Sequence, residues 1–407
     1  PGVILFNGME LLTSSIGEWL TLGFEGLGAN PVIVSLLIDG VWGGIASVLS
    51  FLPQILVLFL FFSILEDSGY MARVAFMLDR VFRRFGVSGR AFMPMIMGFG
   101  CSVPAMINTR TMADERERQV TVRVIPFFSC GAKMPIIGLF AGAIFGGSGL
   151  VAVSAYFMGI ASVIISGIML KKTKIFAGDP APFVMELPSY HAPVPINIFR
   201  ATWERGWSFV KKAGTVILLS TMLLWFLQGF GFEGGAFCMV EDNDNSLLAF
   251  VGNLIAFIFA PLGFGNWQSA VATITGLMAK EGIVSTFGVL LGAGEDSSAI
   301  YSAVSAHFGS SAVVAYSFMA FNLLCAPCFA AMGAIKREMN SGIWTFFAIG
   351  YMTAFAYAVS LIIYQFGSWA TGGGNIIGTA VAGIVLVFMG YMLLRPYKES
   401  TKLTKKL

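Results

Sequence analysis

Four cysteines lie where Pro and Gly interrupt long apolar runs of the sequence. They are Cys101, Cys130, Cys325 and Cys328. Pro and Gly break helices in such runs and release backbone carbonyls from their usual partners. Thiolate sulfur, the thioether sulfur of nearby Met and carbonyl oxygen suit borderline or soft transition metals better than Na⁺ or Ca²⁺. The pattern predicts a transition-metal path through broken helices, although a single free Cys is more often a small buried hydrophobe.

Two adjacent charges, Lys280 and Glu281, stand inside another apolar run. A charge at membrane depth is costly, so such residues indicate either a functional site or a buried ion pair. Successive residues of a helix point about 100° apart, so each of the two needs its own partner. Lys133, in the break that contains Cys130, is the partner that we expect for Glu281 across the two halves of the chain.

Glu66 and Asp67 end the first long apolar run. They either receive or release a cation there, or cap the run and pair with Arg73. The complete set of predicted metal-path residues is Cys101, Cys130, Cys325, Cys328, Glu66, Asp67 and Glu281. No phosphate-binding G-x-x-x-x-G-K-[ST] loop, H-E-x-x-H motif or Ser-His-Asp arrangement occurs, so we expect no catalytic or cofactor-binding residue in this stretch.

The composition identifies the environment that must position these residues. Of 407 residues, 57% are apolar and 12% are charged, whereas soluble domains carry about 25% charged residues. A soluble fold has too little core for so many apolar side chains. A soluble enzyme, a disordered chain and a nucleic-acid binder are therefore excluded, and the sequence predicts an all-α polytopic protein of the lipid bilayer.

Apolar runs of about 20 residues are long enough to cross a bilayer as helices. They cover 44–65, 121–147, 148–170, 213–232, 267–291, 314–337, 343–366 and 376–394. A further run, 91–108, is broken by Pro and Gly. Residues 1–43 place acidic residues among Leu, Ile and Trp, which is typical of an amphipathic surface helix.

The basic residues predict the orientation of these runs. Apart from Lys133 and Lys280, every Lys and Arg falls in 73–90, 110–123, 171–212, 336–337 or 395–406. The other connecting stretches, 1–43, 147–149, 233–266, 292–312 and 367–375, together carry ten acidic residues and no basic ones. The first group is therefore expected in the cytoplasm, together with the C-terminus, and the second group outside.

When the runs are placed in the membrane by this rule, their order is span, re-entrant run, span, span. The same order then follows with the opposite orientation in the membrane. Inverted repeats with broken helices are typical of secondary transporters. The expected organisation is an outer segment (1–43), a first gate repeat (44–170), a cytoplasmic linker (171–212), a second, inverted repeat (213–366), and an extra span with a basic tail (367–407). A full crossing by one of the re-entrant runs is the alternative. Because 1–43 would start outside, we also expect a span before residue 1.

Six motifs resemble the membrane portion of the ferrous iron transport protein B family. They are LEDSGYMAR (65–73), GFGCSVPAMINTR (98–110), PFFSCGAKMP (126–135), FVMELPSYHAP (183–193), GLMAKEGIVSTFG (276–288) and LLCAPCFAAMGAIKRE (323–338). The resemblance implies that 98–104 and 129–135 are paired gate motifs. It also implies that Cys101, Cys130 and Cys328 match pathway cysteines, whereas it assigns no role to Cys325.

The same resemblance implies a function and partners. Fe²⁺ would be the transported substrate, and GTP and Mg²⁺ would bind an N-terminal GTPase domain that this stretch lacks. Small cytoplasmic accessory proteins and a homo-oligomer are further partners to expect, and nucleic acid is not. The location would be the inner or plasma membrane of a bacterium. The function predicted is a GTP-dependent ferrous iron importer, with preference over Mn²⁺ or Zn²⁺ left open.

Other classes of function remain as alternatives. A nucleoside or other organic-solute carrier would share the broken-hairpin repeats but would need polar side chains at the breaks, where Asn108, Lys280, Glu281 and Asn322 are the available ones. An intramembrane thiol enzyme would need a base near a Cys, and no His lies in any span. A purely structural assembly subunit is disfavoured by the charges inside the apolar runs.

Overall fold

The computed structural model describes most of the chain. The described residues are 2–26, 31–84, 89–112, 114–173, 175–176, 190–233, 236–239, 246–292, 297–309 and 311–395. They are almost entirely helical, as the composition predicts, and they form two compact units. Each unit combines segments from both halves of the sequence.

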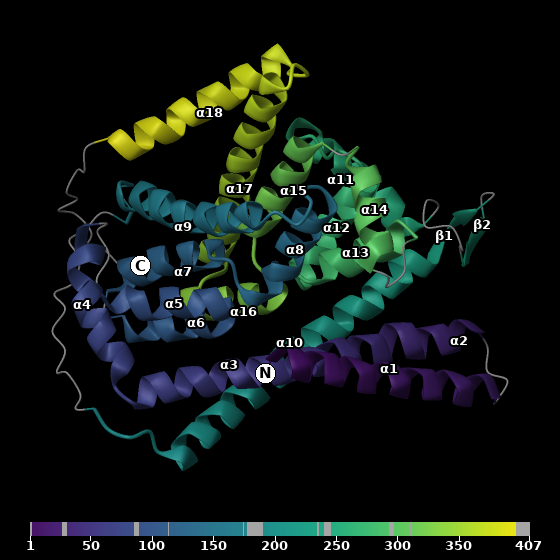
Figure 1. Ribbon diagram of the computed structural model, residues 1–407, viewed down its shortest axis with the longest axis horizontal. Helices are drawn as coiled ribbons and strands as arrows, with labels where there is room; N and C mark the ends of the chain where they lie inside the picture. Colours follow the sequence, from purple (N-terminus) through teal and green to yellow (C-terminus); the bar gives the residue numbers. More distant parts are fainter. Residues whose placement is uncertain are drawn as a thin grey trace. The chain divides into compact units, whose positions relative to one another are not determined.

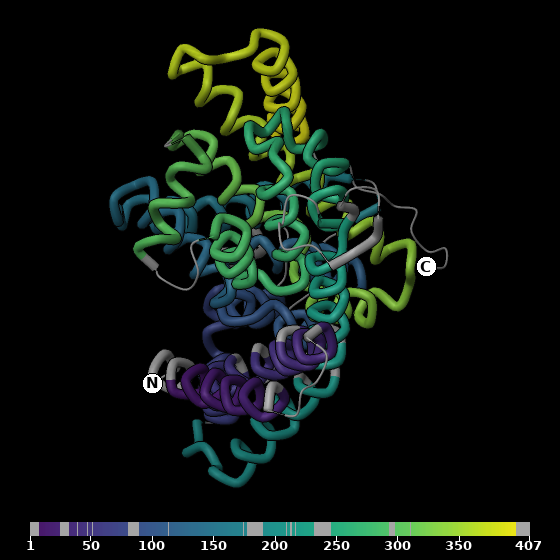
Figure 2. Tube along the Cα trace, turned by 90° about the vertical axis from the view of Figure 1, so that its right-hand side faces the viewer, coloured from purple at the N-terminus to yellow at the C-terminus, as the bar shows by residue number. Residues whose placement is uncertain are grey.

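The first unit comprises residues 1–74 and 186–251. Its helices are α1 (Gly2–Gly26), α2 (Pro31–Ser35), a π-helix (Leu36–Trp42), α3 (Gly43–Asp67) and α10 (Pro195–Gly229), and β1 (Phe230–Glu233) pairs antiparallel with β2 (Ala236–Met239). Helices α1 and α3 lie side by side (Figure 2), and α10 also packs against α3. The indole nitrogens of Trp42 and Trp225 donate to Thr13 O at 3.1 Å and to Ser35 Oγ at 2.9 Å, which ties the helices together.

The second unit comprises residues 75–185 and 252–407. From the first half it contains α5 (Phe92–Gly100), α6 (Ser102–Asn108), α7 (Glu115–Val124), α8 (Met134–Ala143) and α9 (Gly149–Lys171). From the second half it contains α12 (Trp267–Met278), α13 (Gly282–Leu290), α14 (Ser297–His307), α15 (Ala312–Leu324), α16 (Phe329–Met339), α17 (Gly342–Ala370) and α18 (Ile376–Leu394) (Figure 1). Helices α4 (Tyr70–Arg84) and α11 (Leu247–Phe259) each begin in one unit and end in the other.

The same order of elements therefore occurs twice in the second unit. A helix pair with a short break, α5–α6 or α12–α13, is followed by a broken span, α7–α8 or α15–α16, and then by an unbroken helix, α9 or α17. In both halves the two members of the first pair pack against each other. The expected re-entrant run and two spans are thus present in each half, with α14 added in the second, and the inverted orientation of the two halves stays a prediction.

Within the described residues, six helical segments are long and apolar enough to cross a membrane, or up to seven if one bent pair counts as a span. The bent pair joins 247–262 to α12 at an angle of 98°. The sequence predictions missed its first arm, since 233–266 was read as an outer loop, and they also missed α14. The predicted run 213–232 lies at the end of the longer helix α10, and its last three residues belong to β1 instead.

Aromatic side chains from both halves form the core of the second unit. Phe140 on α8 lies 5.3 Å, between ring centroids, from both Phe308 and Phe318, and Phe287 on α13 lies 5.6 Å from Phe318. These rings are almost completely buried. Edge-to-face and tilted aromatic pairs each add about 0.5–1.5 kcal/mol beyond their area burial. The cluster therefore fixes α8 of the first half against α13–α15 of the second.

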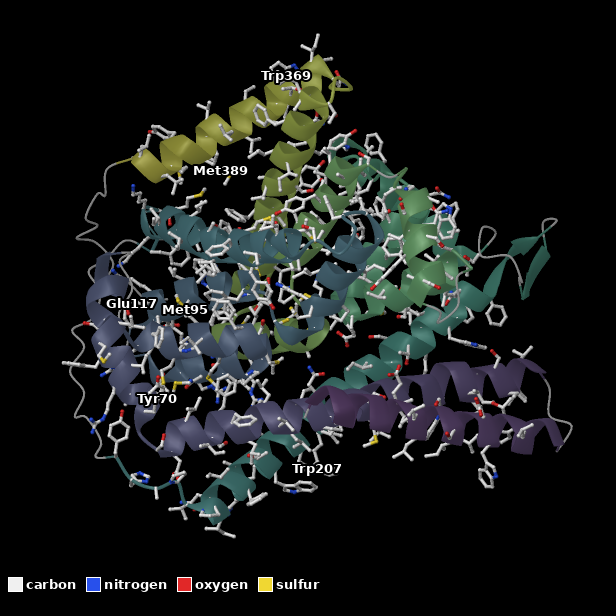
Figure 3. All side chains as sticks on the ribbon, in the orientation of Figure 1. Tyr70, Met95, Glu117, Trp207, Trp369 and Met389 are labelled. Atoms are coloured by element: carbon white, nitrogen blue, oxygen red, sulfur yellow. The ribbon has the colours of Figure 1, made fainter. Side chains whose placement is uncertain are left out.

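Large apolar side chains cover the outer surfaces of several helices. On α18, Ile376 and Leu394 are more than four-fifths exposed, and Trp369 at the end of α17 is two-thirds exposed (Figure 3). On α10, Trp203 and Trp207 stack in parallel with their ring centroids 6.3 Å apart. Aromatic and aliphatic surfaces of this kind suit contact with lipid and with the membrane interface.

Candidate metal-transport site

Four helix breaks make up the predicted site. The backbone is extended at Cys101 (φ −153°, ψ 129°), at Cys130 (φ −85°, ψ 169°), at Ala279 (φ −146°, ψ 125°) and at Cys328 (φ −58°, ψ 157°). The breaks at Cys101, Cys130 and Cys328 fall where Pro and Gly interrupt the apolar runs, as predicted, and the break at Ala279 lies in the apolar run that carries Lys280 and Glu281. An extended residue ends one half-helix and lets the next one start in a new direction.

The residue that begins each second half-helix is a thiol or a carboxylate. Cys101 is the N-cap of α6, Cys130 caps the 3₁₀ turn before α8, Glu281 caps α13 and Cys328 caps α16. Cys101 and Glu281 occupy equivalent breaks of the two halves, and so do Cys130 and Cys328. Thiol and carboxylate groups are ligands that bind transition-metal cations.

These four residues share one neighbourhood within the second unit. Cys101 is close enough to Cys130, Cys328 and Glu281 for their charges to act on it, and Cys328 is close enough to Cys130 and Glu281. Cys101, Cys130 and Cys328 are each partly exposed. The structure therefore brings together four of the seven residues of the predicted metal path.

The neighbourhood is not a closed metal cage. Among the described residues, no three His, Cys, Asp or Glu side chains are placed to hold one ion together. Two other side-chain oxygens near the breaks, Ser129 Oγ and Asn322 Oδ1, are buried and have no hydrogen-bond partner. These oxygens offer further ligands, and Ser129 is a candidate that the sequence analysis missed, because a single Ser beside a Cys carries no distinctive pattern.

The surroundings of Cys325 differ from those of the other three cysteines at the breaks. It is 1% exposed, and the buried ammonium of Lys280 donates to its Sγ atom at 3.1 Å. Lys280 thus has its own polar partner, as expected for a charge at this depth. The engaged sulfur makes Cys325 a less available ligand than Cys101, Cys130 or Cys328.

The predicted ion pair between Lys133 and Glu281 is wrong. Lys133 is 2% exposed and donates instead to the backbone carbonyls of Pro126, Phe128 and Leu323. These three bonds use all the N–H groups of an ammonium. Backbone acceptors carry no sequence signal, which is why the side-chain pattern suggested a carboxylate partner.

Glu66 and Asp67 belong to the first unit and not to the four breaks. Glu66 pairs with Arg205 at 2.8 Å, and Asp67 accepts from the backbone N–H of Val194 at 2.8 Å. Arg73 lies 3.8 Å over the ring of Tyr190. Both carboxylates thus have structural partners that connect the end of α3 to the start of α10.

An ion pair joins the two halves at the C-terminal ends of the two helices that begin at Cys101 and Cys328. Arg110, which follows α6, makes a bidentate contact of 2.8–3.0 Å with Glu338 near the end of α16. The hydrogen bond and the charge of Glu338 raise the pKa of the Arg110 guanidinium above its ordinary value. The pair holds α6 against α16, which pack together.

Two family models match parts of this chain. A family model described as nucleoside recognition matches residues 48–144 and 210–342, which together make up more than half of the chain. A second model, described as the C terminus of ferrous iron transport protein B, matches residues 152–205. No solved structure matches the chain.

Curated relatives match most of this chain. A protein named Fe(2+) transporter FeoB from Staphylococcus aureus (strain COL) is 40% identical over 343 residues, covering 84% of this chain and 50% of the relative. Proteins with the same name are 41% identical in Methanocaldococcus jannaschii, over 84% of this chain and 51% of the relative, and 36% identical in Salmonella typhi, over 90% and 52%. The chain spans about half the length of the curated relatives that it matches.

Proposed function

The chain belongs to the ferrous iron transport protein B family, and on that premise we propose that it forms the ferrous-iron permease of a GTP-dependent importer. The observation that carries this proposal is the placement of three thiols and one carboxylate at the N-caps of the helical segments that follow the four breaks. Fe²⁺ is the cargo that the relatives' name specifies. Sulfur and carboxylate are ligands that bind it.

An open set of ligands is suited to transport. A site that conducts must bind its ion strongly enough to admit it and weakly enough to release it. Cys101, Cys130, Cys328 and Glu281 interact electrostatically without forming a three-ligand cage. Fe²⁺ would pass between pairs of these ligands, aided by the free oxygens of Ser129 and Asn322.

The remaining parts of the proposal rest on the sequence. The acidic stretches would face outside and concentrate cations there, and the basic stretches would face the cytoplasm. The GTPase domain of family members would act on the permease through the basic stretches 73–90 and 171–212. A bacterial inner or plasma membrane, small accessory proteins and a homo-oligomer complete the proposal.

The nucleoside-carrier alternative shares the broken repeats, and the first family model carries a nucleoside-related description. The second family model and the curated relatives favour iron instead. The groups at the N-caps are also sulfur in three of four cases, which suits a metal better than a nucleoside.

Transport by the full-length protein in proteoliposomes tests the proposal. With GTP present under anaerobic conditions, Fe²⁺ uptake should fall about tenfold or more in Cys101→Ser, Cys130→Ser and Cys328→Ser, since a tenfold change corresponds to ~1.4 kcal/mol of lost binding. Cys325→Ser is the matched control, because it makes the same chemical change at a sulfur already engaged by Lys280. Excess nucleoside should leave Fe²⁺ uptake unchanged.

Thermal unfolding of each variant separates transport from folding. Wild-type uptake in all three N-cap variants, with unchanged unfolding midpoints, would contradict a thiol-lined path. Competition by nucleoside would favour the organic-solute carrier.

A further inference from the structure

The side chain of Lys133 occupies a cage of backbone carbonyls. Its Nζ atom lies 2.6 Å from Pro126 O, 3.0 Å from Phe128 O and 2.5 Å from Leu323 O. The residue is 2% exposed. A buried ammonium is costly unless all of its donors are satisfied, and here each of its three N–H groups has an acceptor.

The cage is built from the broken ends of equivalent spans in the two halves. Pro126 and Phe128 follow α7, and Leu323 lies in the last turn of α15. Carbonyls at the end of a helix have no intrahelical partner, and they carry the negative end of the helix dipole. Three such carbonyls directed at one point form the type of site that binds a monovalent cation.

We propose that this cage is a monovalent-cation site that the Lys133 ammonium fills permanently and that holds the two broken spans together. An ammonium and K⁺ carry the same charge and are similar in size, so the empty cage would accept K⁺, NH₄⁺ or a small alkylammonium. This assignment does not depend on the identity of the transported ion.

Occupation by Lys133 also affects where cargo can travel. Lys133 and Lys280 are close enough for their positive charges to interact, and both are 2% exposed. Any further cation that approached the carbonyl ends of the breaks would meet two ammonium groups. Lys133 is also close enough to Cys130 and Cys328 for their charges to interact, and Lys280 is close enough to Cys328, so the two ammonium groups border the proposed thiol path.

Cation rescue of Lys133→Ala tests the proposal in the full-length protein. The variant removes the ammonium and leaves three buried carbonyls without a donor, so its thermal unfolding midpoint should fall below that of wild type in the bulky cation N-methylglucamine. Addition of KCl, NH₄Cl or methylammonium chloride at constant ionic strength should raise the midpoint saturably, because a ligand that binds only the folded state stabilises it by mass action.

Lys280→Ala is the matched control. It also removes a fully buried ammonium, but the acceptor that remains is the sulfur of Cys325 and not a carbonyl cage. It should show no saturable response to K⁺ or NH₄⁺, and neither should wild type. An unfolding midpoint of Lys133→Ala that is independent of the cation, or an equal response in Lys280→Ala, would overturn the proposal.

If Lys133→Ala yields no folded protein in any of these salts, Lys133→Gln provides a second test. The amide supplies N–H donors without charge, so the variant separates the need for a cation from the need for hydrogen bonds. A lowered midpoint in Lys133→Gln supports a cation site. A wild-type midpoint shows that charge is not required and overturns it.

Discussion

Glu281 and Lys133 each lie at one of the four breaks, and the structure gives them separate environments. Lys133 is saturated by three carbonyls, while Glu281 begins α13 as its N-cap. Neither residue compensates the charge of the other. Their side chains therefore have different functions, one holding the spans and the other lining the proposed path.

A double-mutant cycle at these two positions should show additivity. Lys133→Met should destabilise the protein, and Glu281→Gln should mainly reduce Fe²⁺ uptake. The free energies of unfolding should add to within about 0.5 kcal/mol in the double variant, as they do for residues without a shared contact. Chemical denaturation of wild type, the two single variants and the double variant measures this. A double variant clearly more stable than the sum of the two single losses predicts would support an ion pair between Lys133 and Glu281.

The burial of His307 leads us to expect that the free energy of unfolding depends on pH. Its Nε2 atom lies 3.3 Å from Ser269 Oγ, its ring lies 5.9 Å from that of Phe287, and burial lowers its pKa below the ordinary value. The unfolded chain therefore binds the proton more readily, so the free energy of unfolding should fall as the pH drops below about 6.5. His307→Gln, which keeps a polar group but does not titrate, should lose that part of the dependence in thermal unfolding between pH 5 and 8.

The chemistry of single residues was only partly predictable. Pro and Gly next to Cys101, Cys130 and Cys328 located the breaks, because helix breakers act locally. The acceptor of Lys133 in the second half was not predictable, because Leu323 O is a backbone atom 190 residues away. Sequence patterns specify side-chain types, and they do not show which carbonyls a fold leaves free.

At the scale of elements, the ion pair between Arg110 and Glu338 connects α6 of the first half to α16 of the second. The two side chains differ in exposure, since that of Arg110 is 50% exposed and that of Glu338 is 2% exposed. Water can hydrate the guanidinium of Arg110 when it has no partner, but water has little access to the carboxylate of Glu338. The buried carboxylate therefore depends on its partner more than the guanidinium does.

This asymmetry predicts the order of two substitutions. Arg110→Ala leaves a buried carboxylate without a partner and should cost about 1–3 kcal/mol of stability. Glu338→Gln keeps an acceptor and leaves a hydrated guanidinium, so it should cost less. Arg110→Ala combined with Glu338→Gln should recover part of the loss, since removing both partners is less costly than removing one. Equal losses in the two single variants, measured by chemical denaturation, would contradict the argument.

The prediction of elements succeeded where hydrophobic runs are long and failed where they are short. The broken runs became α5–α6, α7–α8, α12–α13 and α15–α16. Helix α11 was missed because its apolar residues were assigned to a loop on the basis of charge alone. Helix α14 was missed because Ser and Ala dominate it, and such residues give no helical periodicity of apolar side chains.

At the scale of the whole molecule, each compact unit draws equivalent elements from both halves of the chain. The first unit combines α3 and α10, and the second combines the four broken elements with α9 and α17. Such sharing follows when two repeats interlock, because each half then buries its broken backbone against the other. Broken backbone is tolerated within a bilayer only under this kind of protection or beside water.

The orientation of the chain in the membrane is the last prediction. Single cysteines introduced at Trp207 and at Ser302, in a background without native Cys, should react differently with an impermeant thiol reagent applied to intact cells. Trp207 is half exposed on α10 (Figure 3) and lies in a basic stretch, and Ser302 is exposed on α14, in a stretch with acidic residues and no Lys or Arg. Cytoplasmic loops carry the excess of Lys and Arg, so Ser302→Cys should be labelled from outside and Trp207→Cys only after the cells are permeabilised.

Labelling after permeabilisation is the internal control, because both positions are exposed and should then react. Labelling of Trp207→Cys in intact cells would reverse the assignment of the basic stretches, and with it the sides from which iron enters and leaves. Equal labelling of both positions in intact cells would place Trp207 and Ser302 on the same side of the membrane and would contradict the orientation predicted from the basic residues. The orientation of the repeats and the direction of import are therefore tested by the same pair of residues.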